Sequence, residues 1–123
     1  MQEQLPQLAF ELTQADPNIW GVAILDASGN IMYRTENWDI SAEVAVVAQS
    51  NEKTSSLTLT GVRFVVVENT PERIIATNVM GKGHVIVCPA GRGKIACYIN
   101  PAAGPRDCLL SVMNYARKIG AFL

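Results

Sequence analysis

Few residues of this chain are able to do chemistry. Its single histidine, His84, lies in the sequence Gly81-Lys82-Gly83-His84. A histidine that acts as a base needs a nucleophile beside it, and the chain has no G-x-S-x-G elbow to present a serine. We therefore interpret His84 as a residue of a turn or a strand start, and we predict no catalytic residue.

The glycines before Lys94 do not form a phosphate-binding loop. In such a loop another glycine lies five positions before the Gly-Lys pair, and a serine or threonine follows the lysine. Here Cys88 stands at the first of these positions and Ile95 at the last. The segment also continues into an expected strand, so no helix N-terminus would face a phosphate. The sequence therefore predicts no cofactor.

The cysteines and acidic residues show no metal-binding pattern. Cys88, Cys97 and Cys108 include no C-x-x-C pair, and the acidic side chains are scattered along the sequence. We interpret the cysteines as buried free thiols, with Cys88 and Cys97 placed to face each other across a hairpin that turns near Arg92. Neither a metal site nor a disulfide is predicted.

Charge is distributed unevenly along the chain. Residues 1–60 carry eight acidic side chains against two basic ones, whereas residues 61–123 carry eight basic side chains against three acidic ones. Such a separation within one domain predicts a basic flank that attracts acidic partners. No run of Lys and Arg, and no alternation of basic with aromatic residues, indicates nucleic-acid binding.

Length and composition predict one folded domain over residues 1–123. The chain is 49% hydrophobic and 17% charged, a balance that supports a packed core. It contains no apolar run of the about 20 residues that a membrane-spanning helix needs, and no signal peptide. We expect a cytoplasmic protein.

Hydrophobic spacing and turn residues predict the order of the elements. An amphipathic helix is expected over 2–14, a hairpin over 20–36 with its turn at 27–30, and a short helix over 42–53 capped by Ser41. Residues 57–59 lead into four strands within 61–100, and a last helix starts at Pro105. This is an α+β fold: a central antiparallel sheet with the terminal helices covering one face. We place Trp20 in the core and leave Trp38 open between core and surface.

Several segments resemble the profilins, the small actin-monomer-binding proteins. Residues 59–67 (LTGVRFVVV) resemble the profilin pattern of a glycine, a basic residue, an aromatic residue and an apolar strand. Residues 71–75 and 81–87 resemble its basic hairpin and glycine-rich turn, and residues 94–98, Pro105 and the helix from Cys108 continue the match. The resemblance covers about residues 19–119, and the short sequence is more similar to archaeal profilins than to those of animals or plants.

The resemblance implies a monomer that binds actin or an actin homologue and modulates its polymerisation. By position, the contact would involve Arg63, Val66, Arg73, Lys82, Lys94, Arg106, Leu109 and Asn114. Val66, Leu109 and Leu110 would form its desolvated centre, with the basic residues steering encounter. Glu68 departs from the family pattern, in which a basic or neutral polar residue is common. Phosphoinositides, another family ligand, would use the same basic residues.

Profilins also bind proline-rich peptides between their terminal helices. The residues of this chain that correspond to that site are Phe10, Tyr33, Tyr115 and Phe122. The early aromatic pair of the family is missing, and Met32 stands near the position of its second-strand tryptophan. The resemblance therefore implies weak or altered binding of proline-rich peptides.

A second class of protein shares part of the predicted element order. Roadblock and longin-like modules, which are dimerising scaffolds for small GTPases, also begin with a helix, two strands and a helix. They usually place three strands before the last helix, whereas this sequence predicts four. A strand at residues 73–79 is the element that separates the two alternatives.

Overall fold

Seven antiparallel strands form one sheet in the order β2-β1-β7-β6-β5-β4-β3, so that the first strand pairs with the last. The computed structural model describes residues 4–123. Its strands are β1 (Ile19–Leu25), β2 (Ile31–Arg34), β3 (Ser56–Leu59), β4 (Val62–Thr70), β5 (Arg73–Thr77), β6 (His84–Ala90) and β7 (Gly93–Ile99). Its helices are α1 (Gln4–Ala15), the 3₁₀ turn η1 (Ser41–Glu43), α2 (Val44–Ala48) and α3 (Pro105–Gly120).

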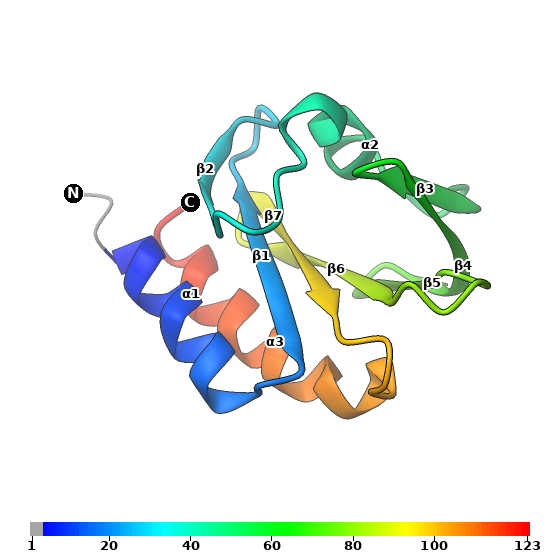
Figure 1. Cartoon of the computed structure of the whole chain (residues 1–123). Helices are drawn as coiled ribbons and strands as arrows, with labels where there is room; N and C mark the ends of the chain where they lie inside the picture. The colour runs from blue at the N-terminus through cyan, green and yellow to red at the C-terminus, as the bar shows by residue number, and fades with distance from the viewer. Residues whose placement is uncertain (1–3) are drawn as a thin grey trace.

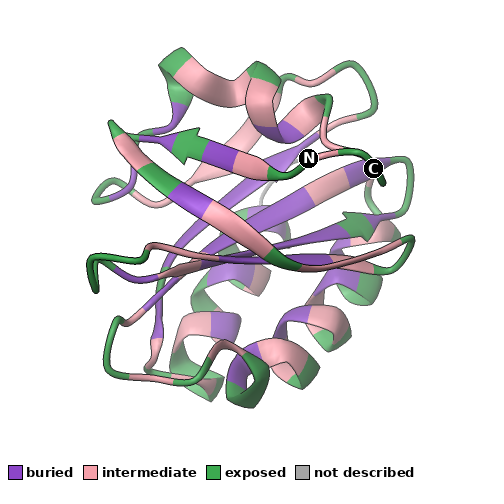
Figure 2. Ribbon diagram, turned by 90° about the vertical axis from the view of Figure 1, so that its right-hand side faces the viewer, coloured by how far each residue is buried: buried purple, intermediate pink, exposed green. Residues whose placement is uncertain are grey.

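The helices form layers on the two faces of the sheet. Figure 1 shows α1 and α3 side by side on one face and α2 on the other. Figure 2 shows the sheet between these layers, with many of its positions buried. The predicted α+β architecture, with the terminal helices on one face, is confirmed.

Alternation along the strands divides the core into two clusters. Along β6, Ile86 and Cys88 face α1 and α3, whereas Val85 and Val87 face α2. We call these sides the terminal-helix face and the α2 face. On the terminal-helix face, Leu5, Ala9 and Leu12 of α1 are fully buried, as their helical spacing predicted. The start of the predicted helix, at residues 2 and 3, lies outside the described residues.

The first hairpin turns where the sequence predicted. Asp26 Oδ1 accepts hydrogen bonds from the N–H groups of Ser28 and Asn30, both at 2.9 Å. Gly29 has a φ of +85°, a left-handed conformation that favours glycine. Local turn chemistry therefore explains how β1 leads into β2.

The region between the first hairpin and β4 differs from the prediction. The helix expected over 42–53 is only the η1 turn and the five-residue α2, and no side chain caps either one. Ser41 does not act as a cap; instead its N–H donates to Asp39 Oδ1 at 2.9 Å. Residues 57–59, expected only to lead into the following strands, belong to the edge strand β3 (Ser56–Leu59), because Leu57 and Leu59 bury their side chains on the α2 face.

The structure decides the environments of the two tryptophans. Trp38 is 4% exposed and stacks on Tyr98, with ring centroids 5.9 Å apart. Trp38 fits there because Gly21 has no side chain: a Cβ at Gly21 would lie 2.8 Å from Trp38 Cβ. Trp20 is 45% exposed at the edge of this aromatic group, so its predicted place in the core is wrong.

The three cysteines are buried free thiols, as predicted. Cys88 and Cys97 share the terminal-helix face, but the strand register pairs Cys88 with Ile95 and Cys97 with Ile86. They therefore lie diagonally across the β6–β7 hairpin instead of facing each other. Burial raises the pKa of Cys88 to about 11 and that of Cys108 to about 12, so both thiols are protonated near neutral pH.

Candidate partner-binding surface

An irregularity in β4 decides which side chains reach the terminal-helix face. Val66 pairs with Ala76, but the next pair joins Glu68 to Ile75, so Val67 is the extra residue of a β-bulge. Val66 therefore faces the α2 side, where it packs against that cluster, and Glu68 faces the terminal helices. Val67 is 62% exposed. Val66 shares the α2 face with Phe64 and so lies outside the predicted surface, whereas the bulge exposes Val67.

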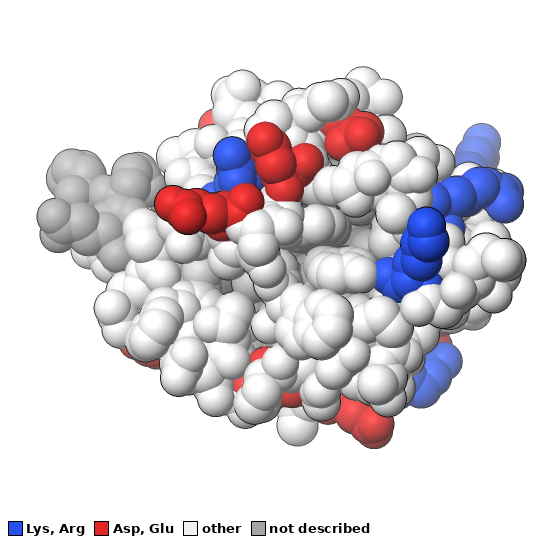
Figure 3. Space-filling view, viewed as in Figure 1, with Lys and Arg blue, Asp and Glu red and all other residues white. Residues whose placement is uncertain are grey.

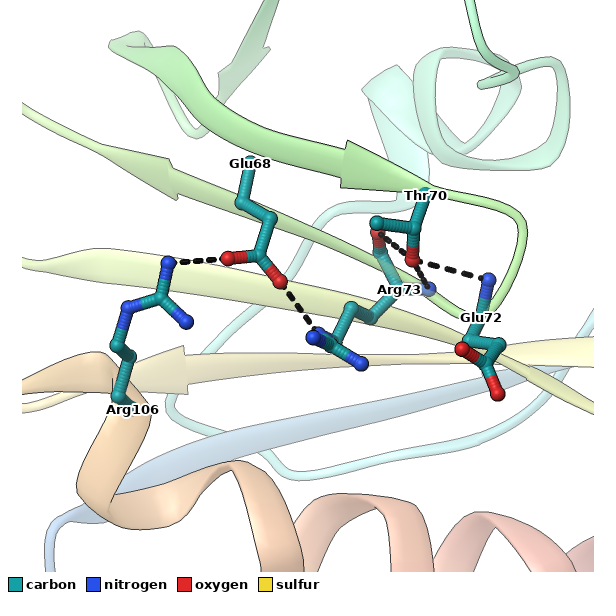
Figure 4. Close-up of polar contacts among 5 residues, drawn as sticks. All are labelled: Glu68, Thr70, Glu72, Arg73 and Arg106. Carbon is teal, nitrogen blue, oxygen red and sulfur yellow. Dashed lines mark hydrogen bonds and ion pairs between the residues drawn. The ribbon is translucent and has the colours of Figure 1, made fainter.

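Glu68 binds two of the predicted site arginines at once. Arg73 Nε, from β5, donates to Glu68 Oε2 at 2.5 Å, and Arg106 Nη2, from the first turn of α3, donates to Glu68 Oε1 (Figure 4). The side chain of Glu68 is 16% exposed, against 25% for Arg73 and 65% for Arg106. Arg106, and then Arg73, hold the pKa of Glu68 below its usual value. We call this group of three residues the Glu68 clip.

Thr70 stabilises the turn between β4 and β5, next to Arg73. Its Oγ1 accepts hydrogen bonds from the N–H groups of Glu72 and Arg73, both at 3.2 Å (Figure 4). Glu72 is exposed and forms no ion pair among the residues that the structure places. Thr70 thus holds the backbone of Arg73 in place, while Glu68 holds its guanidinium group.

Side chains of α3 continue this surface along the helix. Arg106, Leu110, Met113 and Arg117 follow one another at helical spacing. Leu110 is 78% exposed, and Met113 packs partly against the terminal-helix core. Met113 and Arg117 also line a cleft of about 320 Å³ between α3 and the β4–β5 turn. The result is an apolar stripe with a basic residue at each end.

The loop between β5 and β6 adds a further basic residue, Lys82, and contacts the backbone of Arg63 on β4. Asn78 Oδ1 accepts hydrogen bonds from the N–H groups of Met80 and Lys82, and Asn78 Nδ2 donates to the carbonyl oxygen of Arg63 at 2.8 Å. Tyr98 also stabilises the loop, because its hydroxyl donates to the carbonyl oxygen of Lys82 at 2.6 Å. Figure 3 shows basic side chains gathered at the side of the molecule where Figure 1 places β4 and β5.

The structure thus brings together most, but not all, of the predicted contact residues. Arg63, Lys82, Arg106 and Asn114 are exposed. Arg73 and Leu109 are half-buried, Leu109 against the terminal-helix core.

Lys94 lies apart from this surface, on the α2 face. Its Nζ donates to the carbonyl oxygens of Val47, Ala48 and Ser50, at 3.2, 3.1 and 2.7 Å. Burial also lowers the pKa of Lys94. This lysine holds the C-terminal end of α2 and has no donor left for a partner.

Sequence reasoning missed several exposed apolar residues at this surface. Val79 and Met80, in the loop after β5, are 78% and 79% exposed. Met113 and Arg117 could have been found from their helical spacing with Arg106, but the exposure of Val67 depends on the bulge. No local sequence pattern indicates that bulge.

The four residues of the predicted proline-rich site are spread over the side of the terminal helices. Tyr33 and Tyr115 pack partly against the core, whereas Phe10 is 59% and Phe122 is 47% exposed. Lys118 Nζ lies 4.5 Å from the centre of the Tyr115 ring, a cation–π contact that occupies this ring.

His84 is the first residue of β6, as predicted. Its Nδ1 lies 3.0 Å from Thr77 Oγ1 on the neighbouring strand, and its Nε2 is buried without a hydrogen-bond partner in the described structure. Between residues 4 and 123, no three His, Cys, Asp or Glu side chains gather as metal ligands. In the same range, no helix has the length and apolar character to cross a membrane.

The fold and this surface define a class of protein: a helix-flanked antiparallel sheet with a broad surface that is both basic and apolar. No protein-family model matches the chain. Loki profilin-1 of Lokiarchaeum sp. is 40% identical over 130 residues, which cover 97% of each chain. Odin profilin of Odinarchaeota yellowstonii is 30% identical over 120 residues, covering 97% of this chain and 98% of that protein.

Comparison with solved structures also finds profilins. The crystal structure of the LokiProfilin1–rabbit actin complex contains a chain that matches this one with a TM-score of 0.92 and 37% identity, over 100% of this chain and 98% of that chain. Acanthamoeba castellanii profilin IA has the same fold, with a TM-score of 0.74 at 19% identity over 89% of this chain and 92% of that one. The chain belongs to the profilin family.

Proposed function

We propose that this protein binds monomers of actin or an actin homologue and modulates their polymerisation. The match over the whole chain to a profilin crystallised with rabbit actin carries this proposal. The second predicted class, a dimerising scaffold for small GTPases, is not favoured. β4, β5, β6 and β7 are the four strands that were expected between residues 61 and 100, and β5 is the strand that distinguishes the two classes.

The contact surface that we propose combines charge with exposed apolar area. Arg63, Lys82 and Arg106 would steer an acidic partner, and Leu110 and Val67 offer apolar side chains that are more than half exposed. Arg73, Leu109 and Asn114 complete the set, while Val66 and Lys94 leave it because they face the α2 side.

Leu110→Ala tests this surface. Leu110 is 78% exposed, so its truncation should leave thermal unfolding unchanged. We expect affinity for monomeric actin to fall about 5- to 30-fold, the effect of losing an apolar anchor worth about 1–2 kcal/mol. Phe10→Ala is the matched control, because Phe10 is 59% exposed on α1 and should leave binding unchanged. Fluorescence titration and a pyrene-actin polymerisation assay would measure these effects.

Two results would contradict the proposal at different levels. If the wild type neither binds rabbit actin nor the actin homologue of its own organism, and alters the polymerisation of neither, the proposed function is wrong. If Leu110→Ala and Phe10→Ala reduce binding equally, actin binding stands and the proposed surface is wrong.

Further properties belong to the same proposal. We expect the protein to be a monomer in sizing chromatography and to act by binding, without catalysis. We expect it in the cytoplasm, associated with the cytoskeleton. Binding of proline-rich peptides should be weak, because Tyr33 and Tyr115 are half-buried and only Phe10 and Phe122 project. Phosphoinositides would need the arginines that Glu68 already binds.

A further inference from the structure

In the Glu68 clip, the carboxylate of Glu68 occupies a position on the basic surface. Without Glu68, a carboxylate of a bound partner would occupy this position. Its two arginines come from different elements, Arg73 from β5 and Arg106 from α3, and each donates to a different oxygen of Glu68. Arginine–carboxylate pairs of this kind are among the stronger polar contacts in proteins. The two guanidinium groups therefore already form a complete carboxylate site, occupied by a residue of the same chain.

The members of the clip differ in how far a partner can reach them. Arg73 is 25% exposed and its Nε lies 2.5 Å from Glu68 Oε2, whereas Arg106 is 65% exposed. Arg106 also stands in the first turn of α3, one helical turn from the exposed Leu110. A partner that covers Leu110 would bring its own side chains within reach of Arg106, while Arg73 would stay paired with Glu68.

We propose that Arg106 is an exchangeable carboxylate site: Glu68 fills it in the free protein, and an acidic side chain of the bound partner replaces Glu68 there. This inference rests on the proposed binding of actin. Arg73 continues to neutralise Glu68 after the exchange, so the half-buried carboxylate of Glu68 keeps an ion-pair partner. The exchange replaces one carboxylate at Arg106 with another. Because the charge next to Arg106 then changes little, the exchange is reversible.

The same arrangement selects against polyphosphate ligands. With Glu68 in place, the three residues together carry one net positive charge, and a phosphate cluster would meet the Glu68 carboxylate at the same point. A single carboxylate needs only Arg106, whereas several phosphates need both arginines free. Glu68 therefore acts as a specificity-determining residue that favours an acidic protein surface over a phosphorylated headgroup.

Glu68→Gln tests the proposal, with Glu72→Gln as the matched control. Both variants remove one negative charge from the same hairpin, but only Glu68 binds arginines. In calorimetric titration with inositol hexakisphosphate at low salt, Glu68→Gln should bind about 3- to 10-fold more tightly than wild type, a range set by pair energies of partly exposed charges. Glu72→Gln should bind as wild type does. Equal gains in both variants would overturn the proposal.

Actin binding is the second arm of the experiment. Because Glu68 competes with the partner, Glu68→Gln should tighten binding to monomeric actin about 3- to 10-fold and make it more dependent on salt, and Arg106→Gln should remove that gain. Weaker binding by Glu68→Gln would overturn the proposal, because it would show that Glu68 itself contacts or positions the partner. If no variant binds actin, the proposed function fails, and the titration with inositol hexakisphosphate still decides the role of Glu68.

Thermal unfolding of each variant accompanies both arms. Should Glu68→Gln fail to fold, the pair Glu68→Thr and Glu72→Thr repeats the comparison with a residue that favours strands. The same outcomes apply to this second pair.

Discussion

Lys94 Nζ lies 2.7 Å from the carbonyl oxygen of Ser50, which ties the middle of the sheet to the end of α2. Val47, Ala48 and the hydroxyl of Ser50 accept from the same ammonium group. Since α2 has only five residues, it owes its place to such contacts more than to helix propensity. A lysine that seemed free to bind a partner is therefore structural.

Lys94→Met should lower the free energy of unfolding by about 1–3 kcal/mol, because it leaves several carbonyl groups without their charged donor. Urea denaturation would measure the change. Lys53→Met is the control, since Lys53 is exposed in the loop after α2, and its effect should stay within about 0.5 kcal/mol. Affinity of Lys94→Met for monomeric actin should equal that of the wild type. A selective loss of binding with unchanged stability would return Lys94 to the contact surface.

Gly120→Ala should destabilise the protein, although alanine is the better helix former. A Cβ at Gly120 would lie 2.3 Å from the backbone nitrogen of Gly91, in the turn between β6 and β7. Neither backbone can move without separating α3 from the sheet, so we expect a loss of about 1–3 kcal/mol in unfolding free energy. Gly104→Ala is the control, because an added Cβ there meets only the end of the Asp107 side chain. Thermal melts of both variants would measure the difference in stability. Equal Tm values would contradict the close contact between Gly120 and Gly91.

The different environments of the two tryptophans predict opposite fluorescence behaviour. A Trp38→Phe variant keeps only Trp20, which is 45% exposed, so iodide should quench its emission strongly. A Trp20→Phe variant keeps only Trp38, which is 4% exposed and stacked on Tyr98, so its emission should be blue-shifted and resist quenching. Similar quenching constants in the two variants would contradict the described packing.

Acid should destabilise the protein partly through Glu68. Arg106 and Arg73 hold its folded-state pKa below the ordinary value of 4.5, so the unfolded chain binds this proton more readily. The stabilisation is present above about pH 4.5 and is lost as the pH falls through the lowered folded-state pKa. The difference in unfolding free energy between wild type and Glu68→Gln should therefore shrink from pH 6 to pH 3 in urea titrations.

Other carboxylates contribute in the same direction and remain in that variant. Hydrogen bonds from Asn30 lower the pKa of Asp26, and hydrogen bonds from Ser41 lower that of Asp39. Glu68→Gln should therefore retain part of the acid sensitivity. Arg106→Gln should also weaken the dependence, because Arg106 is the main cause of the shift at Glu68. A constant difference between wild type and Glu68→Gln across this range would contradict the ion pairs.

Local patterns were sufficient for most of the fold. The helical spacing of Leu5, Ala9 and Leu12, and the turns that separate the apolar runs after residue 61, report interactions between near neighbours in the chain. The short β3 and the truncated α2 escaped prediction, because the edge of the sheet and the α2 face stabilise them only after folding.

The sequence by itself determined the family, the order of the main elements and the basic character of residues 61–123. Only the tertiary structure decided which side chains share a face. The bulge that exposes Val67 and directs Glu68 toward α3 depends on pairing with β5. The Glu68 clip then joins residues 38 positions apart, and Lys94 reaches Ala48, at the end of α2, 46 positions earlier in the chain. Contacts over such distances follow from strand register and layer packing, which no local pattern specifies.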